Sequence, residues 1–321
     1  MKIAALALAA VFTSLAGPVV LAQGTYPDRP IRMVVPFPPG GALDVLGRQV
    51  ADRMAKNMNA QFVIENRPGA TGHVGGEAVA KAAADGYTML FGASSTHAVS
   101  PNILKDLKYN PIEDFTPISL AATVHNVLVV HPSVPANNVR EFIDYARANP
   151  GKLSFGSSGI GSNLHLAGEL LKLLGKFDMV HVPYSSPQVI PDLLSGRIQV
   201  MVDNLPPVIQ HIRAGKLKAI GVASPDPIPD LPGLPMVSET VPGFAVIAWG
   251  VMLAPKGTPR PIIARLNEEM KKAIESAEVR EAFARLGFIP AWRTPEATLD
   301  FMRNESAKWK RVVNEANIKV E

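Results

Sequence analysis

The sequence predicts an α/β protein of two lobes, each a mainly parallel sheet flanked by helices. Short apolar runs typical of buried strands alternate with longer amphipathic runs at helical spacing. This alternation is typical of parallel sheets with helices on both faces. It occurs in two blocks, residues 27–125 and 126–250, and a mainly helical stretch follows. We therefore expect lobe 1 to comprise residues 23–125 and 251–321, and lobe 2 to comprise residues 126–250.

The first block opens with an apolar run at 31–35, which predicts a buried strand. Apolar residues then recur at helical spacing, so a helix is expected over 43–54. Strands at 62–64 and 88–91 are expected on either side of a helix at 74–84.

The second block repeats this pattern and ends in an extended connection. Its apolar runs predict five strands, at residues 127–130, 153–155, 179–182, 200–202 and 219–222. Helices are expected between them at 139–148, 164–174 and 190–194. The proline-rich segment 225–242 lacks periodicity, so we expect it to be extended.

The last part of the chain is expected to form three helices. Apolar residues lie on one face over 261–274, and a second helix over 279–286 should end at Gly287. Thr294 is a suitable N-cap for a third helix, and Pro295 suits its first turn.

The first 22 residues have the pattern of a secretory signal peptide. Lys2 precedes an apolar stretch at 3–15, and small residues surround Ala22, after which we expect cleavage. A membrane anchor is the rival interpretation, but polar residues and Pro18 interrupt the apolar run, which is short for a span of about 20 residues. Cleavage would lower the net charge from +4 to +3 and release a protein into the periplasm.

Composition excludes several classes of function. The chain has no cysteine, which removes disulfides, iron–sulfur clusters, thiolate zinc sites and cysteine nucleophiles. Its 32 basic and 28 acidic residues are scattered, so no nucleic-acid-binding surface is expected. The sequence contains no Walker A, HExxH or EF-hand motif, and no two histidines are four residues apart. We therefore expect no metal, no cofactor and no enzymatic activity.

Glycine- and hydroxyl-rich turns that follow strands are the strongest functional signal. The turn after the first strand opens a helix, where backbone N–H groups and the helix dipole favour an anion. Gly40 and Gly41 would allow a ligand close to the backbone, although the segment could equally be only a tight turn. The candidate residues of this turn are Phe37, Pro39, Gly40, Gly41, Ala42 and Asp44.

Similar turns follow later strands in both blocks. Ligands bind outside the carboxyl ends of parallel strands, so these turns predict a cleft between the lobes. The turns contain no Arg or Lys, which indicates that a carboxylate would be held by dipoles, hydroxyls and water. The further candidates are Ser94, Ser95 and Thr96 in lobe 1, and Ser157, Ser158, Gly159, Ser162, Tyr184 and Asp203 in lobe 2. Tyr184 and Asp203 could equally be structural residues, and Trp249 is expected to be a packed core aromatic.

Motifs along nearly the whole mature chain resemble the Bug-type solute receptors of tripartite tricarboxylate transporters. They occur at residues 26–31 (YPDRPI), 39–41 (PGG), 65–70 (ENRPGA), 84–88 (ADGYT), 111–118 (PIEDFTPI), 149–153 (NPGKL), 155–159 (FGSSG), 165–170 (HLAGEL), 181–184 (HVPY), 203–206 (DNLP) and 257–259 (GTP).

The resemblance implies a type II-like periplasmic binding protein fold that closes on a small carboxylate in the interlobe cleft. It also implies delivery of that ligand to integral membrane permease subunits, and we expect the receptor to be a monomer. One ligand carboxylate would be held by the turn around residues 37–42 and by either Ala70 and Thr71 or the nearby residues 94–96. The hinge is expected at 123–127 and 248–252.

One segment departs from the family pattern, and two alternative functions remain open. After Tyr184 the family usually has a lysine and glycines, whereas this chain has Ser185, Ser186 and Pro187. Because the segment 185–191 helps to define the distal pocket, ligand identity cannot be transferred from relatives. A ligand-sensing partner of a signalling receptor would have the same fold. A secreted hydrolase would need His165 or another histidine beside Ser157 or Ser158.

Overall fold

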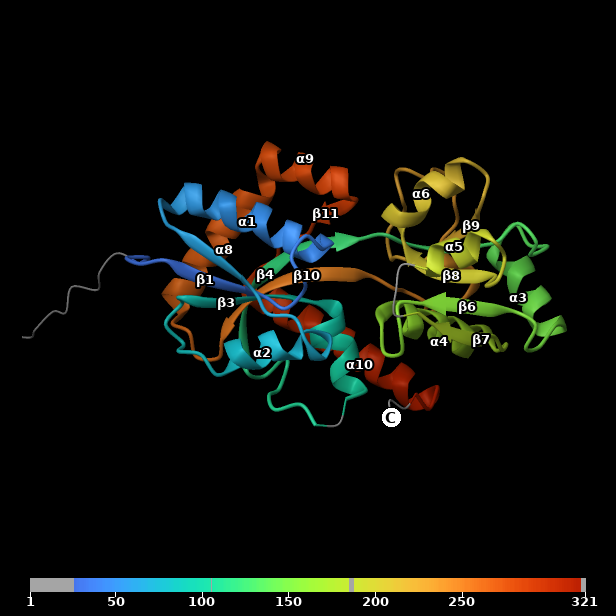
Figure 1. Ribbon diagram of the computed structural model, residues 1–321, viewed down its shortest axis with the longest axis horizontal. Helices are drawn as coiled ribbons and strands as arrows, with labels where there is room; N and C mark the ends of the chain where they lie inside the picture. Colours follow the sequence, from blue (N-terminus) through green and yellow to red (C-terminus); the bar gives the residue numbers. More distant parts are fainter. Residues whose placement is uncertain (1–25, 105, 185–187, 319–321) are drawn as a thin grey trace, which may run out of the picture.

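The computed structural model describes residues 26–104, 106–184 and 188–318, so the expected signal peptide and residues 185–187 lie outside the described part. Two lobes lie side by side along the long axis of the molecule, each built on one sheet (Figure 1). The α/β architecture of two lobes is confirmed.

Lobe 1 contains a six-stranded sheet in the order β11-β4-β10-β3-β1-β2. Strands β2, β1 and β3 are parallel, whereas β10 is antiparallel to β3 and β4, and β11 is antiparallel to β4. The strands are β1 Ile31–Val35, β2 Phe62–Asn66, β3 Thr88–Ala93, β4 Phe115–Val124, β10 Ala248–Pro255 and β11 Phe288–Pro290.

Helices cover both faces of this sheet, which explains why its central strands are apolar throughout. In β1, Met33 and Val35 join the core under α1, α8 and α9, while Val34 joins the opposite core with α2 and α10 (Figure 1). The helices are α1 Ala42–Met58, α2 His73–Ala80, α8 Arg260–Glu275, α9 Ala277–Leu286 and α10 Pro295–Glu315, with single turns η1 Ala70–Gly72, η2 Ser95–Val99 and η3 Ser100–Asn102.

Lobe 2 contains a five-stranded sheet in the order β7-β6-β8-β5-β9. Strands β7, β6 and β8 are parallel, and β5 is antiparallel to both β8 and β9. Its elements are β5 Asn126–Val130, α3 Val139–Ala148, β6 Ser154–Ser157, α4 Asn163–Gly175, β7 Val180–Pro183, α5 Val189–Leu194, β8 Val200–Asn204, α6 Leu205–Arg213, β9 Lys218–Val222 and α7 Val237–Thr240.

Both sheets are mixed, although the alternating pattern suggested mainly parallel ones. The difference arises where the chain passes between lobes. Only His125 separates β4 in the first sheet from β5 in the second, and β10 returns to the first sheet at Ala248. Strands that cross directly have no crossover helix to restore a parallel direction.

The structure also contains elements that the sequence pattern did not indicate. These are the long strands β4 and β10, where only the hinge segments 123–127 and 248–252 were expected, together with α6, the short strand β11, and α7 within the segment expected to be extended. The C-terminal helices begin and end close to their expected residues, and Thr294 caps α10 by accepting a hydrogen bond from the Ala297 N–H. No helix within the described ranges is both long and apolar enough to cross a membrane. The proposed division of the chain at 125/126 and 250/251 stays a prediction.

Candidate functional site

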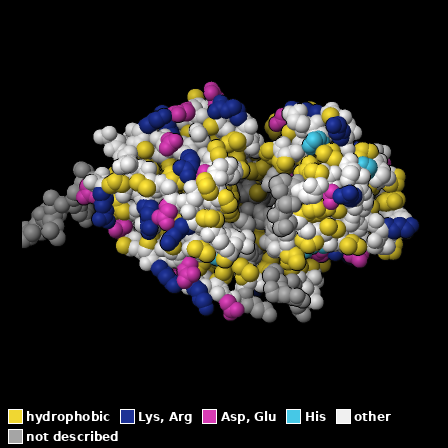
Figure 2. Space-filling view, viewed as in Figure 1, with side chains coloured by type: hydrophobic (Ala, Val, Ile, Leu, Met, Phe, Trp, Pro, Cys, Tyr) yellow, Lys and Arg dark blue, Asp and Glu magenta, His cyan; other side chains and the backbone are white. Residues whose placement is uncertain are grey.

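A cavity of about 590 Å³ lies between the lobes. A groove separates the two lobes in the space-filling view, and hydrophobic side chains border it on both sides (Figure 2). None of the described residues that line the cavity is charged. They are Ala42, Leu43, Thr71, Ala93, Ser94, Ser95, Val124, Ser158, Ser162, Asn163, Leu164, Asn204, Pro206, Pro207, Ala248, Trp249, Leu286 and Phe288.

Two long helices begin at this cavity and direct backbone N–H groups toward it. In α1, Val45 is the first residue found to bond back, to the carbonyl of Gly41, so the first N–H groups of the helix have no intrahelical partner. In α4, Leu166 bonds back to Ser162 and the His165 N–H donates to Ser162 Oγ, which leaves the amides of Asn163 and Leu164 without a partner in the helix. The positive ends of both helix dipoles therefore favour an anion here.

Five hydroxyl groups accompany these helix starts. Within the described part of the chain, the side chains of Thr71, Ser95 and Ser158 have no hydrogen-bond partner. Ser162 Oγ accepts from the His165 N–H at 3.2 Å and keeps its own proton for another acceptor. Ser94 Oγ accepts from Asn163 Nδ2 at 2.5 Å, which joins lobe 1 to lobe 2 beside the cavity.

The turn that carries Thr71 is conformationally strained. Four successive residues have positive φ: Gly69 at 128°, Ala70 at 46°, Thr71 at 55° and Gly72 at 95°. A Cβ at Gly72 would lie 2.6 Å from Thr96 Cγ2, so a larger residue would not fit there. Strained backbone of this kind concentrates at ligand-binding loops. Thr71 lines the cavity together with Ser94 and Ser95, whereas Ala70 and Thr96 do not.

Two residues of the cavity lining each carry a buried polar atom that has no partner among the described residues. These atoms are the indole Nε1 of Trp249 and Oδ1 of Asn163. The Trp249 ring packs in the core against Phe301, with 5.6 Å between ring centroids, as expected for a core aromatic. Its N–H group is nevertheless unsatisfied, and a buried donor without an acceptor is unfavourable. Both atoms lie beneath the surface of the cavity, so a ligand would not reach them without a shift of the lining.

Asp44 holds the first turn in place and does not line the cavity. Its carboxylate accepts from the Gly40 N–H at 2.8 Å, from Arg48 Nε at 3.0 Å and from Asn66 Nδ2 at 2.8 Å. Burial alone would raise its pKa, but the hydrogen bonds from Arg48, Asn66 and Gly40 outweigh burial and lower the pKa below its ordinary value. The other residues of this turn outside the cavity lining are Phe37, Pro39, Gly40 and Gly41.

Neighbouring serines of lobe 2 point to different surroundings. Ser158 and Ser162 line the cavity, whereas Ser157 is fully buried and its Oγ lies 2.7 Å from His181 Nε2. His181 stacks on His165 at 3.9 Å, and burial lowers the pKa of both rings, to about 4 and about 3 respectively. Ser157 therefore pairs with a neutral histidine, but no substrate reaches a buried hydroxyl, which argues against hydrolysis.

The remaining candidates of lobe 2 also have protein partners outside the cavity. Tyr184 Oη donates to Asp192 at 2.8 Å. Asp203 is buried and accepts from the Asn204 N–H at 2.7 Å, and burial raises its pKa to about 7. Gly159 does not line the cavity.

Several lining residues were not among the expected site residues. Asn204 is next to the candidate Asp203 at the end of the same strand, so the strand-end rule led to this turn but to the polar residue that does not line the cavity. Leu286 and Phe288 come from α9 and β11, and no local signal connects them to the cleft. The others are Leu43, Ala93, Val124, Asn163, Leu164, Pro206, Pro207, Ala248 and Trp249.

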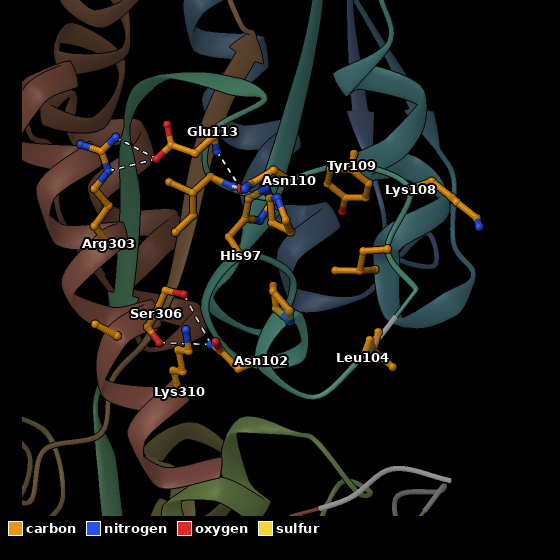
Figure 3. Close-up of a pocket in the computed structure, with 15 residues that line it drawn as sticks. His97, Asn102, Leu104, Lys108, Tyr109, Asn110, Glu113, Arg303, Ser306 and Lys310 are labelled. Carbon is orange, nitrogen blue, oxygen red and sulfur yellow. Dashed lines mark hydrogen bonds and ion pairs between the residues drawn. The ribbon is translucent and has the colours of Figure 1, made fainter. Parts of the chain in front are cut away.

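A second groove, of about 780 Å³, belongs to lobe 1 alone. It lies between α10 and the segment that follows η2, where Arg303 reaches Glu113 at 2.8 Å and Asn102 donates to the Ser306 carbonyl (Figure 3). Its charged groups include this ion pair, and neither lobe 2 nor the hydroxyl turns contribute to it. Among the described residues, no group of His, Asp or Glu could hold a metal ion. The interlobe cavity is therefore the candidate site.

Comparisons with known proteins agree with this geometry. A family model described as tripartite tricarboxylate transporter family receptor matches residues 46–318. Protein BugT of Bordetella pertussis is 38% identical over 320 residues, which cover 98% of each chain. A Rhodopseudomonas palustris protein solved with adipate is 34% identical, with a TM-score of 0.77 over 92% of this chain and 99% of that one. MatC of the same species, solved with bound malate, is 32% identical, with a TM-score of 0.74 over 90% of this chain and 100% of that one. The chain therefore belongs to the tripartite tricarboxylate transporter family receptors, which are periplasmic solute-binding proteins and not enzymes.

Proposed function

We propose that this protein captures a small carboxylate in the interlobe cavity and delivers it to a membrane permease of the tripartite tricarboxylate type. The observation that carries the proposal is an uncharged cavity where the N-termini of α1 and α4 meet free hydroxyls. Such a site suits an anion that must also be released, because dipoles and neutral donors bind more weakly than a salt bridge.

The ligands of the relatives support this class of solute. One solved relative holds adipate and another holds malate, and both are carboxylates. We assign the carboxylate contacts to Thr71, Ser94, Ser95, Ser158 and Ser162, with Asp44 as the residue that positions the first turn. The sheet membership of the strands supports a lobe 1 of residues 23–125 and 251–321 and a lobe 2 of residues 126–250. The signal pattern before Gln23 supports cleavage after Ala22 and a receptor in the periplasm, and a monomer fits the role of capturing one ligand between two lobes.

Calorimetric titration of the mature protein with mono-, di- and tricarboxylates tests the proposal. One class should bind, and at a hundredfold excess over Kd it should stabilise the fold by about 2.7 kcal/mol. Ser158→Ala should weaken binding about 2- to 10-fold, because one neutral hydrogen bond contributes about 0.5–1.5 kcal/mol. Ser133→Ala is the matched control, since this exposed serine bonds only to His131 far from the cavity.

Bound ligand carried through purification could mask binding, so the titration is repeated on protein that has been unfolded, dialysed and refolded. If refolded protein with a native circular dichroism spectrum binds none of the carboxylates, the proposal is wrong. If Ser158→Ala and Ser133→Ala bind the carboxylate with the same affinity, Ser158 does not contact the ligand, and the ligand is held elsewhere.

A further inference from the structure

Most of the polar residues of the interlobe cavity lie in one group, and many of its apolar residues lie in another. The hydroxyl-bearing turns contact one another, since η1 packs against η2 and η2 packs against α4. On the other side, Pro206 at the start of α6 packs against Gly287, which lies between Leu286 and Phe288. We call the first group the polar end, formed by Thr71, Ser94, Ser95, Ser158, Ser162 and Asn163. We call the second group the apolar end, formed by Val124, Pro206, Pro207, Ala248, Leu286 and Phe288.

The helix that begins at the apolar end offers the cavity no hydrogen-bond donor from its first turn. Helices α1 and α4 present free N–H groups. In α6, by contrast, the N–H of the first residue, Leu205, donates to the His125 carbonyl, and the next two residues are Pro206 and Pro207, which line the cavity. Proline has no N–H group. The favourable dipole of α6 is therefore covered by two apolar rings and cannot form a short contact with an anion.

The backbone of Trp249 lies beside the polar end. In the antiparallel pairing of β10 with β3, Gly250 is opposite Ala93, so Trp249 is alongside Ser94. Trp249 is 2% exposed and lines the cavity, and its N–H group has no partner in the described part of the chain. The donors that a carboxylate meets at the polar end are therefore the hydroxyls and the helix amides, and Trp249 supports this end as a rigid core side chain.

Near the apolar end, Asn204 is the one polar side chain in the described lining. Its Oδ1 accepts from Asn126 Nδ2 at 3.0 Å, which leaves its own amide N–H groups for the cavity. Arg285 precedes Leu286 but does not line the cavity. Among the described lining residues, a second carboxylate at this end would find one neutral donor side chain and no cation, and burying a charge in that way is strongly unfavourable.

We infer that the ligand is an acid with a single carboxylate and an apolar body about the size of an aromatic ring. This inference rests on the proposed function. The carboxylate binds at the polar end, and the apolar body lies against Leu286, Phe288 and the two prolines. A cavity of about 590 Å³ has room for such a ligand. Burial of its apolar surface is the main source of affinity, and one amide of Asn204 can accept a neutral oxygen substituent.

A matched pair of ligands tests the number of carboxylates. Hexanoate and adipate have the same chain length, but adipate carries a second carboxylate. By titration calorimetry, hexanoate and 3-phenylpropionate should each bind at least about tenfold more tightly than adipate or malate. Tighter binding of adipate, malate or citrate than of hexanoate would overturn this inference and leave the proposed function intact. If no carboxylate binds refolded protein, both the inference and the proposed function fail.

A substitution at the apolar end provides an independent test. Leu286 is half-buried and lies in the last turn of α9, where a lysine is compatible with the helix dipole. Leu286→Lys should supply the missing cation and raise the ratio of adipate affinity to hexanoate affinity at least tenfold. Leu286→Gln is the matched uncharged control and should leave this ratio near its original value. If both variants fold and give the same ratio, the distal part of the ligand does not lie at Leu286, and the inference is wrong.

Discussion

Several polar residues that follow strands beside the cleft are engaged by the protein itself. Asp44 accepts from the turn that precedes it, and Ser157 pairs with His181. Asp203 differs from these because its only hydrogen bond among the described residues comes from the N–H of Asn204. It is buried, and burial raises its pKa to about 7, which makes it the most perturbed carboxyl group near the cleft.

Asp203 should make the protein less stable as the pH rises through the range from about 4 to about 7. In this range the folded state keeps the proton that the unfolded state has lost, so the free energy of unfolding falls by up to about 1.4 kcal/mol per pH unit. The effect is complete above the folded pKa and absent below the unfolded value of 3.8. Asp203→Asn should remove this slope, and urea unfolding at several pH values between 4 and 8 measures it.

The comparison must be made as a difference between the two proteins. Buried histidines such as His165 have lowered pKa values, so they increase stability as the pH rises over much of the same range. That contribution is common to both proteins and cancels. The quantity to compare is the unfolding free energy of the original protein minus that of Asp203→Asn. If this quantity is the same at pH 4.5 and at pH 8, Asp203 is already ionised in the folded state.

The start of α6 and the end of α9 meet across the cleft. Gly287 ends α9 in the left-handed conformation, with φ of 71°, and a Cβ there would overlap Cγ of Pro206. The residue therefore needs to be glycine for two separate reasons, one local and one between the lobes. The local reason was visible in the sequence as a helix stop, but the contact with Pro206 was not.

Gly287→Ala should weaken ligand binding as well as stability. The left-handed conformation alone costs about 1 kcal/mol for alanine. The added methyl group would also push Pro206 away and oppose closure of the lobes, so Kd should rise at least about tenfold in calorimetry. Gly257→Ala is the matched control, because Gly257 has φ of 85° but nothing within 4 Å of the position that an added methyl group would occupy. Equal Kd values for the two variants would show that the Pro206 contact does not contribute to the bound state.

The sequence predicted elements well where their signals are local. The cap of α10 at Thr294 depends on residues a few positions apart, and it was found where expected. In contrast, β11 exists because it pairs with β4, more than 160 residues earlier in the chain, and α6 begins with prolines that resemble a helix break. Prolines are compatible with the first turn of a helix because its N–H groups need no partner there.

The same distinction applies to the candidate site. The rule that ligands bind at strand ends led to Ser94, Ser95 and Ser158, which the structure brings together in one cavity. It could not separate Ser157 from Ser158, because successive side chains along a strand point to opposite sides and the sequence does not show which side faces the cleft. The apolar end was missed because Leu286 and Phe288 reach the cavity only through tertiary packing.

Contacts on both sides of the cleft hold the two lobes together. Ser94 meets Asn163 at the polar end, and Pro206 meets Gly287 at the apolar end. The chain crosses between the sheets near His125 and Ala248, and α10 packs on lobe 1 and also touches α4 of lobe 2 (Figure 1). A ligand that contacts both lobes binds the closed arrangement more tightly than an open one. The ratio of these two affinities sets how far the ligand shifts the population toward the closed arrangement.

Ligand binding should therefore shorten the distance between α6 and α9. Because the chain contains no cysteine, Gln210→Cys and Ala284→Cys can carry spin labels at two exposed sites beside the mouth of the cleft. The distance distribution from pulsed dipolar spectroscopy should be broad without ligand and should become shorter and narrower at saturation.

Adding Asn163→Ala removes the bond to Ser94 and should lengthen the ligand-free distances. A pair within lobe 1, Asp52→Cys with Ala284→Cys, should not respond, since α1 and α9 pack together. If calorimetry shows binding while the distance between α6 and α9 stays constant, the ligand enters a rigid cleft and the hinge proposed at residues 123–127 and 248–252 is excluded.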